Sequence, residues 1–438
     1  MKNSFFKGGN DVRLAMTINK KIGLSTIVFI VYCLYYISGY TGSAHNYFIV
    51  ALFLCWNLIA FLEDKKAYEY AIGNKSFGYL LLFILYYFFT SFIIADFLYT
   101  IEYVVIFLCL YGTMIQYRYY SFRNKIYEIK LIVYSLMAGF VFFSISAILF
   151  YTINPSAARI LAADFYAFDN IAIGGGYAIA FGSSILSVYL VETIIRKKIT
   201  RGKRFLFVFL IILFEILIIK TESTTTLIAN VFGIIWGVVN KKLMSKSKIR
   251  GSKILIYFFL VILFFLIILN INNIGKFIVS VTSSGTENVL IRRFNRIGLK
   301  MKYHGIQTGY KNYVDERFGT IATSWNTFLK YPLFGIGYKC GNIFSLLEMN
   351  GVGTHSELFD VLAQYGIIGF LFWISFIYNS LKCQSDYYKC KGWKITFLIM
   401  LIFNPFRSFH GYIVVFFIIP MIEYLIKNRF IKKGVNYE

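Results

Sequence analysis

The sequence predicts an all-α polytopic membrane protein with about twelve transmembrane helices and both termini on the cytoplasmic side. Hydrophobic residues make up 58% of the 438 residues, and the mean hydropathy of +0.64 lies far above that of soluble domains. Apolar runs such as Ile254 to Ile271 recur along the chain and are long enough to cross a bilayer. Most of the 45 Lys and Arg residues fall on one side of these runs, which the positive-inside rule assigns to the cytoplasm.

The individual spans follow from the centres of the apolar runs. In chain order, these centres lie near Phe29, Phe53, Phe83, Phe107, Phe140, Ala180, Phe209, Phe232, Phe264, Phe370, Leu398 and Phe416. The basic residues Lys20 and Lys21 lead into a full-length first run, so we expect no cleavable signal peptide. Because the net charge of +24 follows this topology, it gives no reason to expect a nucleic-acid partner.

A long connection separates the ninth and tenth spans. At about 80 residues it far exceeds a typical loop, which favours a functional segment. The chain therefore divides into transmembrane helices one to nine (1–271), an extracytoplasmic loop with amphipathic helices (272–354), and helices ten to twelve with a cytoplasmic tail (355–438). The loop carries more Lys and Arg than Asp and Glu, so we expect an anionic ligand. Anionic lipid headgroups are the alternative for the cluster of Arg292, Arg293 and Arg296.

The loop contains a predicted amphipathic helix from Glu316 to Lys330, ended by Pro332. Its apolar face carries Phe318, Ile321, Trp325, Phe328 and Leu329. We expect this face to point down onto the membrane or over a cavity.

A histidine and a polar stripe open the tenth span, in the stretch THSELFDVLAQYG. His355 precedes the helix, where the positive end of the helix dipole disfavours protonation and helps keep a neutral ring that accepts a proton. Glu357, Asp360 and Gln364 then follow on one helical face. Acidic groups are costly in hydrocarbon, so the stripe should face a wet cavity or a partner. In the alternative interpretation, the stripe only bonds to a neighbouring helix and His355 caps that contact.

Two stretches, SWNTFLKYPLFGIGYKCGN and THSELFDVLAQYGIIGFLFW, resemble the signature of the O-antigen polymerase and O-antigen ligase superfamily. In that family an Arg precedes a Trp-containing helix that ends in Pro-hydrophobic-Phe-Gly-x-Gly. A His-Asn or His-Ser pair then opens a helix that ends in Gly-x-x-Gly. The matching residues are Trp325, Pro332, Phe334, Gly335, Gly337, His355, Ser356, Leu358, Gly366 and Gly369.

Two weaker matches accompany this signature. Arg159, followed by Asp169 and Asn170, resembles the family's outer loop before the sixth span. TESTTTLIA occupies the place of a Thr-x-Ser-Arg segment, with Thr224 where the family often has Arg, and nearby Lys220 could replace that cation. The arginine-glycine repeats of some O-antigen polymerases are not satisfied in either loop.

The resemblance implies polyprenyl-diphosphate-linked oligosaccharides as donor and acceptor, and therefore cations that bind a diphosphate leaving group. Arginine suits this task because its planar fork binds phosphate oxygens in pairs. The candidate diphosphate ligands are Arg317, Arg159 and Arg407, with Arg293 as the competitor of Arg317 and Lys220 as a substitute.

The same chemistry needs a base for the acceptor hydroxyl, and His355 is our candidate. Asp360 and Glu357 are candidates for orienting His355 or for binding the acceptor sugar. No Asp-x-Asp pair flanks the proposed site, so we expect a metal-independent reaction without a cofactor.

The function expected from these features is inverting polymerisation of lipid-linked repeat units into surface polysaccharide of the capsule or O-antigen type, at the outer face of the cytoplasmic membrane. Membrane lipids, a flippase and a chain-length regulator are the partners that this function implies. One alternative is a ligase that transfers the finished glycan to another acceptor. A second is a twelve-helix transporter or flippase, although no internal repeat is visible.

Three residues near or within spans keep no assigned role. Glu102 and Glu215 lie inside apolar runs, where acidic groups are uncommon. His410, close to Arg407, is either structural or functional.

Overall fold

The computed structural model describes residues 22–40, 45–94, 97–154, 157–163, 172–196, 199–245, 271–282, 295, 298–299, 314–336, 351–353, 356–382, 390–404 and 409–431. All regular elements within these ranges are helices. In chain order they include α2 (Leu24–Ser38), α3 (His45–Glu63), α4 (Lys65–Ile72), α5 (Lys75–Ile94), α6 (Phe97–Tyr111), α7 (Thr113–Arg123), α8 (Ile126–Ile153), α9 (Ala157–Ala163), α10 (Tyr177–Arg196), α11 (Arg201–Lys220), α12 (Thr224–Ser245), α14 (Ile271–Thr282), α16 (Val314–Lys330), α17 (Glu357–Lys382), α18 (Gly392–Phe403), α19 (Phe409–Ile413), η2 (Val414–Ile418) and α20 (Ile419–Ile431).

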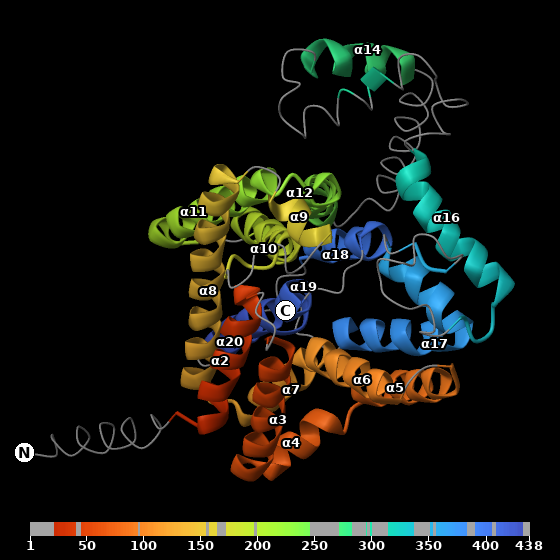
Figure 1. Ribbon diagram of the computed structural model, residues 1–438. Coiled ribbons are helices and arrows are strands. Elements are labelled where there is room, and N and C mark those ends of the chain that lie inside the picture. The colour runs from red at the N-terminus through yellow and green to blue at the C-terminus, as the bar shows by residue number, and fades with distance from the viewer. Residues whose placement is uncertain are drawn as a thin grey trace, which may run out of the picture.

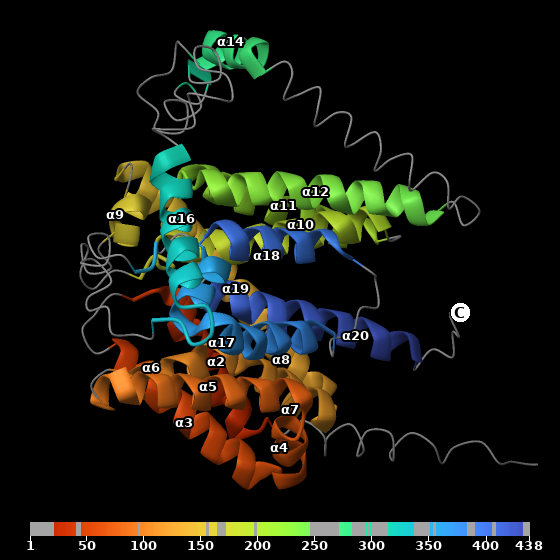
Figure 2. The same cartoon turned by 90° about the vertical axis from the view of Figure 1, so that its right-hand side faces the viewer.

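The helices form a bundle with α11 and α12 at one edge and α3 and α4 at the other (Figure 1, Figure 2). Every predicted span centre within the described ranges lies inside a helix, whereas Phe264 lies outside those ranges. The short helices α4, α7 and α9 were not predicted, because their sequences are too short or too polar to resemble spans.

Four helical stretches among the described residues are long and apolar enough to cross a membrane: Ile126–Ile153, Tyr177–Arg196, Glu357–Lys382 and Phe409–Lys427. A fifth is added if α4 and α5, which meet at a bend of 66°, are counted as one span. The chain is therefore an all-helical, multi-pass membrane protein. The number twelve, the side of the termini and the three-part division remain predictions.

The centre of the bundle is the continuous helix formed by α19, η2 and α20. Its residues from Tyr412 to Ile419 are almost fully buried. Phe417 contacts the rings of Phe29 and Tyr120, with centroids 4.7 and 6.2 Å apart, respectively. Aromatic contacts of this kind stabilise helix association in a setting where lipid supplies little hydrophobic driving force.

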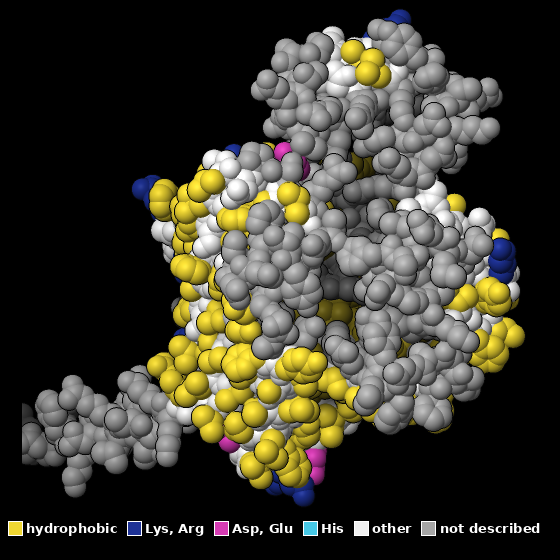
Figure 3. Space-filling model, viewed as in Figure 1, with side chains coloured by type: hydrophobic (Ala, Val, Ile, Leu, Met, Phe, Trp, Pro, Cys, Tyr) yellow, Lys and Arg dark blue, Asp and Glu magenta, His cyan; other side chains and the backbone are white. Residues whose placement is uncertain are grey.

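The flanks of the bundle are covered by large apolar side chains, such as Leu54 and Leu58 on α3 and Phe142 and Leu149 on α8, all of them exposed. Figure 3 shows hydrophobic side chains over these flanks. An apolar surface of this extent is a liability in water but suits contact with lipid.

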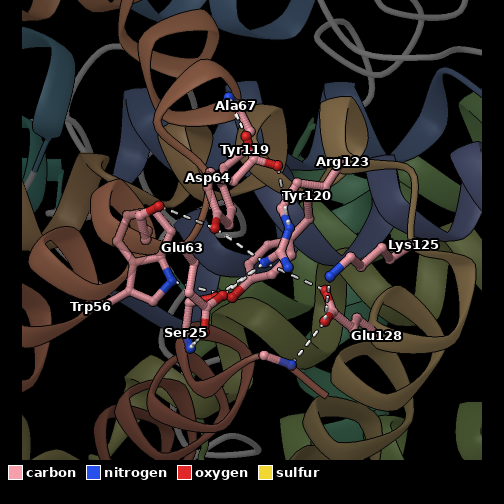
Figure 4. Close-up of polar contacts among 12 residues, drawn as sticks. Ser25, Trp56, Glu63, Asp64, Ala67, Tyr119, Tyr120, Arg123, Lys125 and Glu128 are labelled. Atoms are coloured by element: carbon pink, nitrogen blue, oxygen red, sulfur yellow. Dashed lines mark hydrogen bonds and ion pairs between the residues drawn. The ribbon is translucent and has the colours of Figure 1, made fainter. Parts of the chain in front are cut away.

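We call the end of the bundle where α17 begins and α18 ends the outer end, after its predicted orientation. The opposite end, where α3 and α7 end, is the inner end. An ion-pair cluster lies at the inner end (Figure 4). Arg123, whose side chain is 4% exposed, lies 3.1 Å from Glu63, 3.8 Å from Asp64 and 3.5 Å from Glu128.

This inner-end cluster fixes the start of α2. Glu63 accepts hydrogen bonds from the Ser25 amide at 3.0 Å and the Ser25 hydroxyl at 2.7 Å. Glu128 accepts a bond from the Gly23 amide at 2.9 Å. Burial raises the pKa of Glu63, but the Ser25 bonds and Arg123 outweigh it and hold the pKa below its usual value.

Candidate active site

Helix α16 of the outer segment packs on α17. It runs from Val314 to Lys330, close to the predicted bounds of Glu316 and Lys330. Contact of its apolar face with the membrane or a cavity stays a prediction. The residues buried against the protein are Ser324 and Thr327, whereas Trp325 and Leu329 of the apolar face are 41% and 58% exposed. Small hydroxyl side chains let the helix approach α17 closely, and Ser324 bonds to it, so much of the apolar face is left toward the surroundings.

The turn after α16 fits into a break in α17. At Gly366 the helix leaves helical geometry, with φ 61° and ψ −169°. The Ile367 amide donates to the Pro332 carbonyl at 2.8 Å, and the Ile336 amide donates to the Ala363 carbonyl at 3.1 Å. We call these two segments, 332–336 and 363–368, the clasp. Backbone groups released by the break in one helix are thereby satisfied by the other segment.

Two signature glycines are explained by the clasp. Gly335 has φ 67°, and both it and Gly366 adopt conformations that glycine tolerates best. A Cβ atom on Gly366 would overlap the Leu333 carbonyl oxygen, and one on Gly335 would overlap the backbone of Gln364. The motif glycines are therefore required where the two backbones meet.

The first turn of α17 is tied to α16 through a buried carboxylate. The Ser324 hydroxyl donates to Oδ1 of Asp360 at 2.6 Å, and the Ser356 amide donates to Oδ2 at 3.4 Å. The Gly353 amide donates to the Ser324 hydroxyl oxygen at 2.8 Å. Asp360 thus bonds to a neighbouring segment, as the alternative interpretation of the polar stripe expected.

His355 itself lies outside the described residues. Its chain neighbours on both sides belong to the network just described, through Gly353 and Ser356. Ser356 also caps α17, because its hydroxyl oxygen accepts a bond from the Phe359 amide at 3.2 Å.

The end of α18 meets the start of α17. The Glu357 amide donates to the Asn404 carbonyl at 2.9 Å, and both side chains are buried. The side-chain nitrogen of Asn404 is buried and has no hydrogen-bond partner in the part of the chain that the structure describes. A buried donor without a partner costs about 1–3 kcal/mol, so it calls for an explanation such as a bound ligand.

Sequence reasoning missed Ser324 and Asn404. Ser324 directly precedes Trp325 in the signature, and Asn404 lies three residues before Arg407. Their positions beside signature and candidate residues could therefore have identified them as site residues. Their roles depend on contacts between segments far apart in the chain, which the sequence does not show.

The predicted diphosphate ligands stay predictions. The backbones of Arg317 in α16 and Arg159 in α9 are described but their side chains are not, and Arg293 and Arg407 lie outside the described residues. Lys220 is exposed at the outer end of α11. The structure brings together Glu357 and Asp360 of the predicted set and does not test the cations.

Two residues without an assigned role have structural contacts. The Nε2 atom of the buried His410 lies 2.8 Å from the Ile37 carbonyl oxygen of α2. Glu215 accepts bonds from the Ser187 hydroxyl at 2.5 Å and the Asn230 amide at 2.9 Å, which link α10, α11 and α12. The side chain of Glu102 is not described.

No group of three or more His, Cys, Asp or Glu side chains in the described part of the chain could hold a metal ion. The expectation of a metal-independent site remains a prediction.

The comparison with protein families gives one match. The family model described as O-antigen ligase matches residues 205–374, which include α11, α12, α16 and the clasp. No curated protein matches the chain. Members of this family are membrane glycosyltransferase-like enzymes, polymerases and ligases, which implies lipid-linked glycan substrates. Over residues 205–374 the chain is therefore similar to the O-antigen ligase family, which confirms its predicted resemblance to the O-antigen polymerase and O-antigen ligase superfamily.

Proposed function

We propose that this protein polymerises polyprenyl-diphosphate-linked oligosaccharide repeat units into surface polysaccharide, at the outer face of the cytoplasmic membrane. The observation that carries the proposal is the joint between α16 and α17. The clasp and the Ser324–Asp360 bond hold the two signature segments together on either side of His355 in the chain. A rigid support of this kind is what a positioned catalytic group requires.

In the proposed reaction His355 accepts the proton of an acceptor sugar hydroxyl. The hydroxyl oxygen attacks the anomeric carbon of the lipid-linked chain, and the bond from that carbon to the polyprenyl diphosphate breaks. Attack opposite the leaving group inverts the anomeric centre. The diphosphate leaves with the bonding electrons, and cations among Arg317, Arg159, Arg407, Arg293 and Lys220 stabilise its charge.

The described carboxylates have supporting roles in this proposal. Asp360 is a positioning residue, because its bonds to Ser324 and Ser356 fix the chain on both sides of His355. Glu357 and Asn404 lie where α17 and α18 meet, and the Asn404 amide is a donor available to an acceptor sugar or a phosphate oxygen.

The experiment is the size distribution of surface polysaccharide and of carrier-linked glycan in cells that lack the protein. These cells are complemented with wild type, His355→Ala or Arg317→Ala, and membrane insertion is measured for each variant. Arg204→Ala is the matched control, because Arg204 is exposed at the inner end of α11. We expect single repeat units to accumulate on the carrier lipid without the protein, and only wild type and the control to restore long chains.

Other outcomes would separate the alternatives. Long chains that persist on the carrier but never reach their final anchor would identify a ligase. Retained polymer synthesis by a well-inserted His355→Ala protein would contradict the base assignment. A transporter would be indicated if activity depended on a counter-ion while chain length stayed constant.

A further inference from the structure

Helix α16 carries a polar flank, whose member Thr327 is also buried against the protein. We define the polar flank as Thr323, Asn326, Thr327 and Lys330, which recur at helical spacing along one side of the helix. Together with Leu329 they line a cavity of about 360 Å³. This volume lies within the roughly 300–1,000 Å³ typical of sites for small molecules.

The chemistry of the polar flank points to a neutral, hydroxyl-rich ligand. The Asn326 carboxamide can donate and accept hydrogen bonds, and Lys330 adds a donor. The Thr323 hydroxyl donates to the Gly319 carbonyl at 2.9 Å, and its oxygen can still accept a bond from a ligand. A diphosphate would call for several cations, preferably arginines, and the described lining contains a single lysine. A lipid tail would call for an apolar lining, and Leu329 is the one large apolar side chain in the described lining.

The position of the polar flank connects it to the candidate active site. Ser324, which bonds to Asp360, lies between Thr323 and Asn326 on the same two turns of helix. The ring of Trp325 also meets that of Phe359 on α17, with centroids 6.0 Å apart. A ligand on the polar flank would therefore be held at a fixed position relative to the first turn of α17.

We infer that the polar flank of α16 is a saccharide-binding subsite, which holds a sugar of the lipid-linked glycan away from the reacting bond. This inference rests on the proposed function, since that function supplies the glycan. Hydrogen bonds from Asn326 and Lys330, both exposed side chains, recognise the sugar hydroxyls. The subsite binds the glycan itself and not its carrier.

The test uses the purified full-length protein in lipid nanodiscs. The probe is a carrier-free oligosaccharide of one repeat unit, released from the surface polysaccharide of the same cells and titrated by saturation-transfer NMR. We compare wild type with an Asn326→Ala, Lys330→Gln double variant, and with Lys203→Gln as a charge-matched control at the inner end. We expect Kd to rise at least about tenfold in the double variant and to stay unchanged in the control.

A second titration distinguishes the sugar from the phosphate. Inorganic pyrophosphate should leave oligosaccharide binding at the polar flank unchanged. Displacement of the oligosaccharide by pyrophosphate, lost in the double variant, would overturn the inference in favour of a phosphate site. An unchanged Kd in the double variant would also overturn it.

Failure of the inference and failure of the proposed function give different results. If wild type restores long chains in cells while the double variant binds the oligosaccharide normally, the polymerase stands and the saccharide subsite falls. If cells without the protein still make long chains while the double variant loses binding, the subsite stands and the polymerase proposal falls.

Discussion

Carboxylates cluster at both the inner end and the outer end of the bundle, and the two ends hold them differently. At the inner end Glu63, Asp64 and Glu128 surround the guanidinium of Arg123. At the outer end the described partners of Asp360 are a hydroxyl and a backbone amide, next to a broken helix. The first arrangement surrounds a cation with carboxylates and locks helix ends together, whereas the second ties the first turn of α17 to α16, next to a break in α17.

This difference indicates that the inner end mainly stabilises the fold and that the outer end mainly serves the reaction. Charge compensation at the inner end predicts that substitutions there mainly reduce stability. A glycine-dependent clasp, and an Asn404 amide with no partner among the described residues, predict that substitutions at the outer end mainly reduce activity.

The largest effect is expected from Arg123→Ala, which leaves the carboxylates of the inner-end cluster without their shared cation. Removing one partner of a buried pair costs about 3–5 kcal/mol, and we expect the lower end because Glu63 and Asp64 are partly exposed. Thermal unfolding in detergent measures this loss. Arg123→Lys should recover part of the stability, since it keeps the charge without the fork. If Arg123→Ala left the unfolding temperature unchanged, the stabilising role of the inner-end cluster would be contradicted.

Gly366→Ala should break the clasp. The backbone conformation at this position costs about 1–3 kcal/mol for other residues, and the added Cβ would also meet the Leu333 carbonyl. We expect polymer synthesis to be lost while most of the protein still inserts. Gly78→Ala is the matched control, because no atom lies near that position on α5. Equal synthesis by both variants would contradict a functional clasp.

Asp360→Ala should reduce polymer synthesis about a hundredfold, because a displacement of about 1 Å at a catalytic group has an effect of that size. Ser324→Ala removes one of the bonds to Asp360 and should have a smaller effect in the same direction. Chain-length analysis per inserted protein measures both. If Asp360→Ala lowers unfolding temperature as much as Arg123→Ala does, the outer end is structural as well.

Asn404→Ala removes a buried donor that has no partner among the described residues. We therefore expect little change in unfolding temperature, and a drop of about tenfold in synthesis if the amide donates to substrate. Asn57→Ala on α3 is a useful contrast, because that side chain bonds to Phe53 and Tyr68 within the protein. A clear loss of stability without loss of activity would refute a ligand role for Asn404.

The smallest effect concerns pH. The pKa of Glu63 is lower in the folded protein than its usual value of about 4.3. Its ionised form therefore adds stability above about pH 4.3, and this contribution is lost as the pH falls through the folded-state pKa. Unfolding temperature should decrease on acidification below about pH 4, and less so in Glu63→Gln. A steeper decrease in the variant would reverse the assigned sign.

The sequence by itself determined the helical membrane class, because apolar runs and the distribution of charge depend only on local composition. It also located α16 and the signature segments, since helical spacing and Pro332 are local signals. The family resemblance pointed to Gly335 and Gly366, but it did not explain why glycine is required at these two positions. The polar stripe of the tenth span pointed to Asp360, without its partner.

Only the tertiary structure decided how these pieces meet. The partner of Asp360 is a serine 36 residues away, and the break at Gly366 is filled by the turn after Pro332. The buried side of α16 is its hydroxyl side, because contact with α17 outweighs the amphipathic pattern. Contacts between distant segments depend on packing and backbone hydrogen bonding in the folded chain. The local periodicity of the sequence therefore does not predict them.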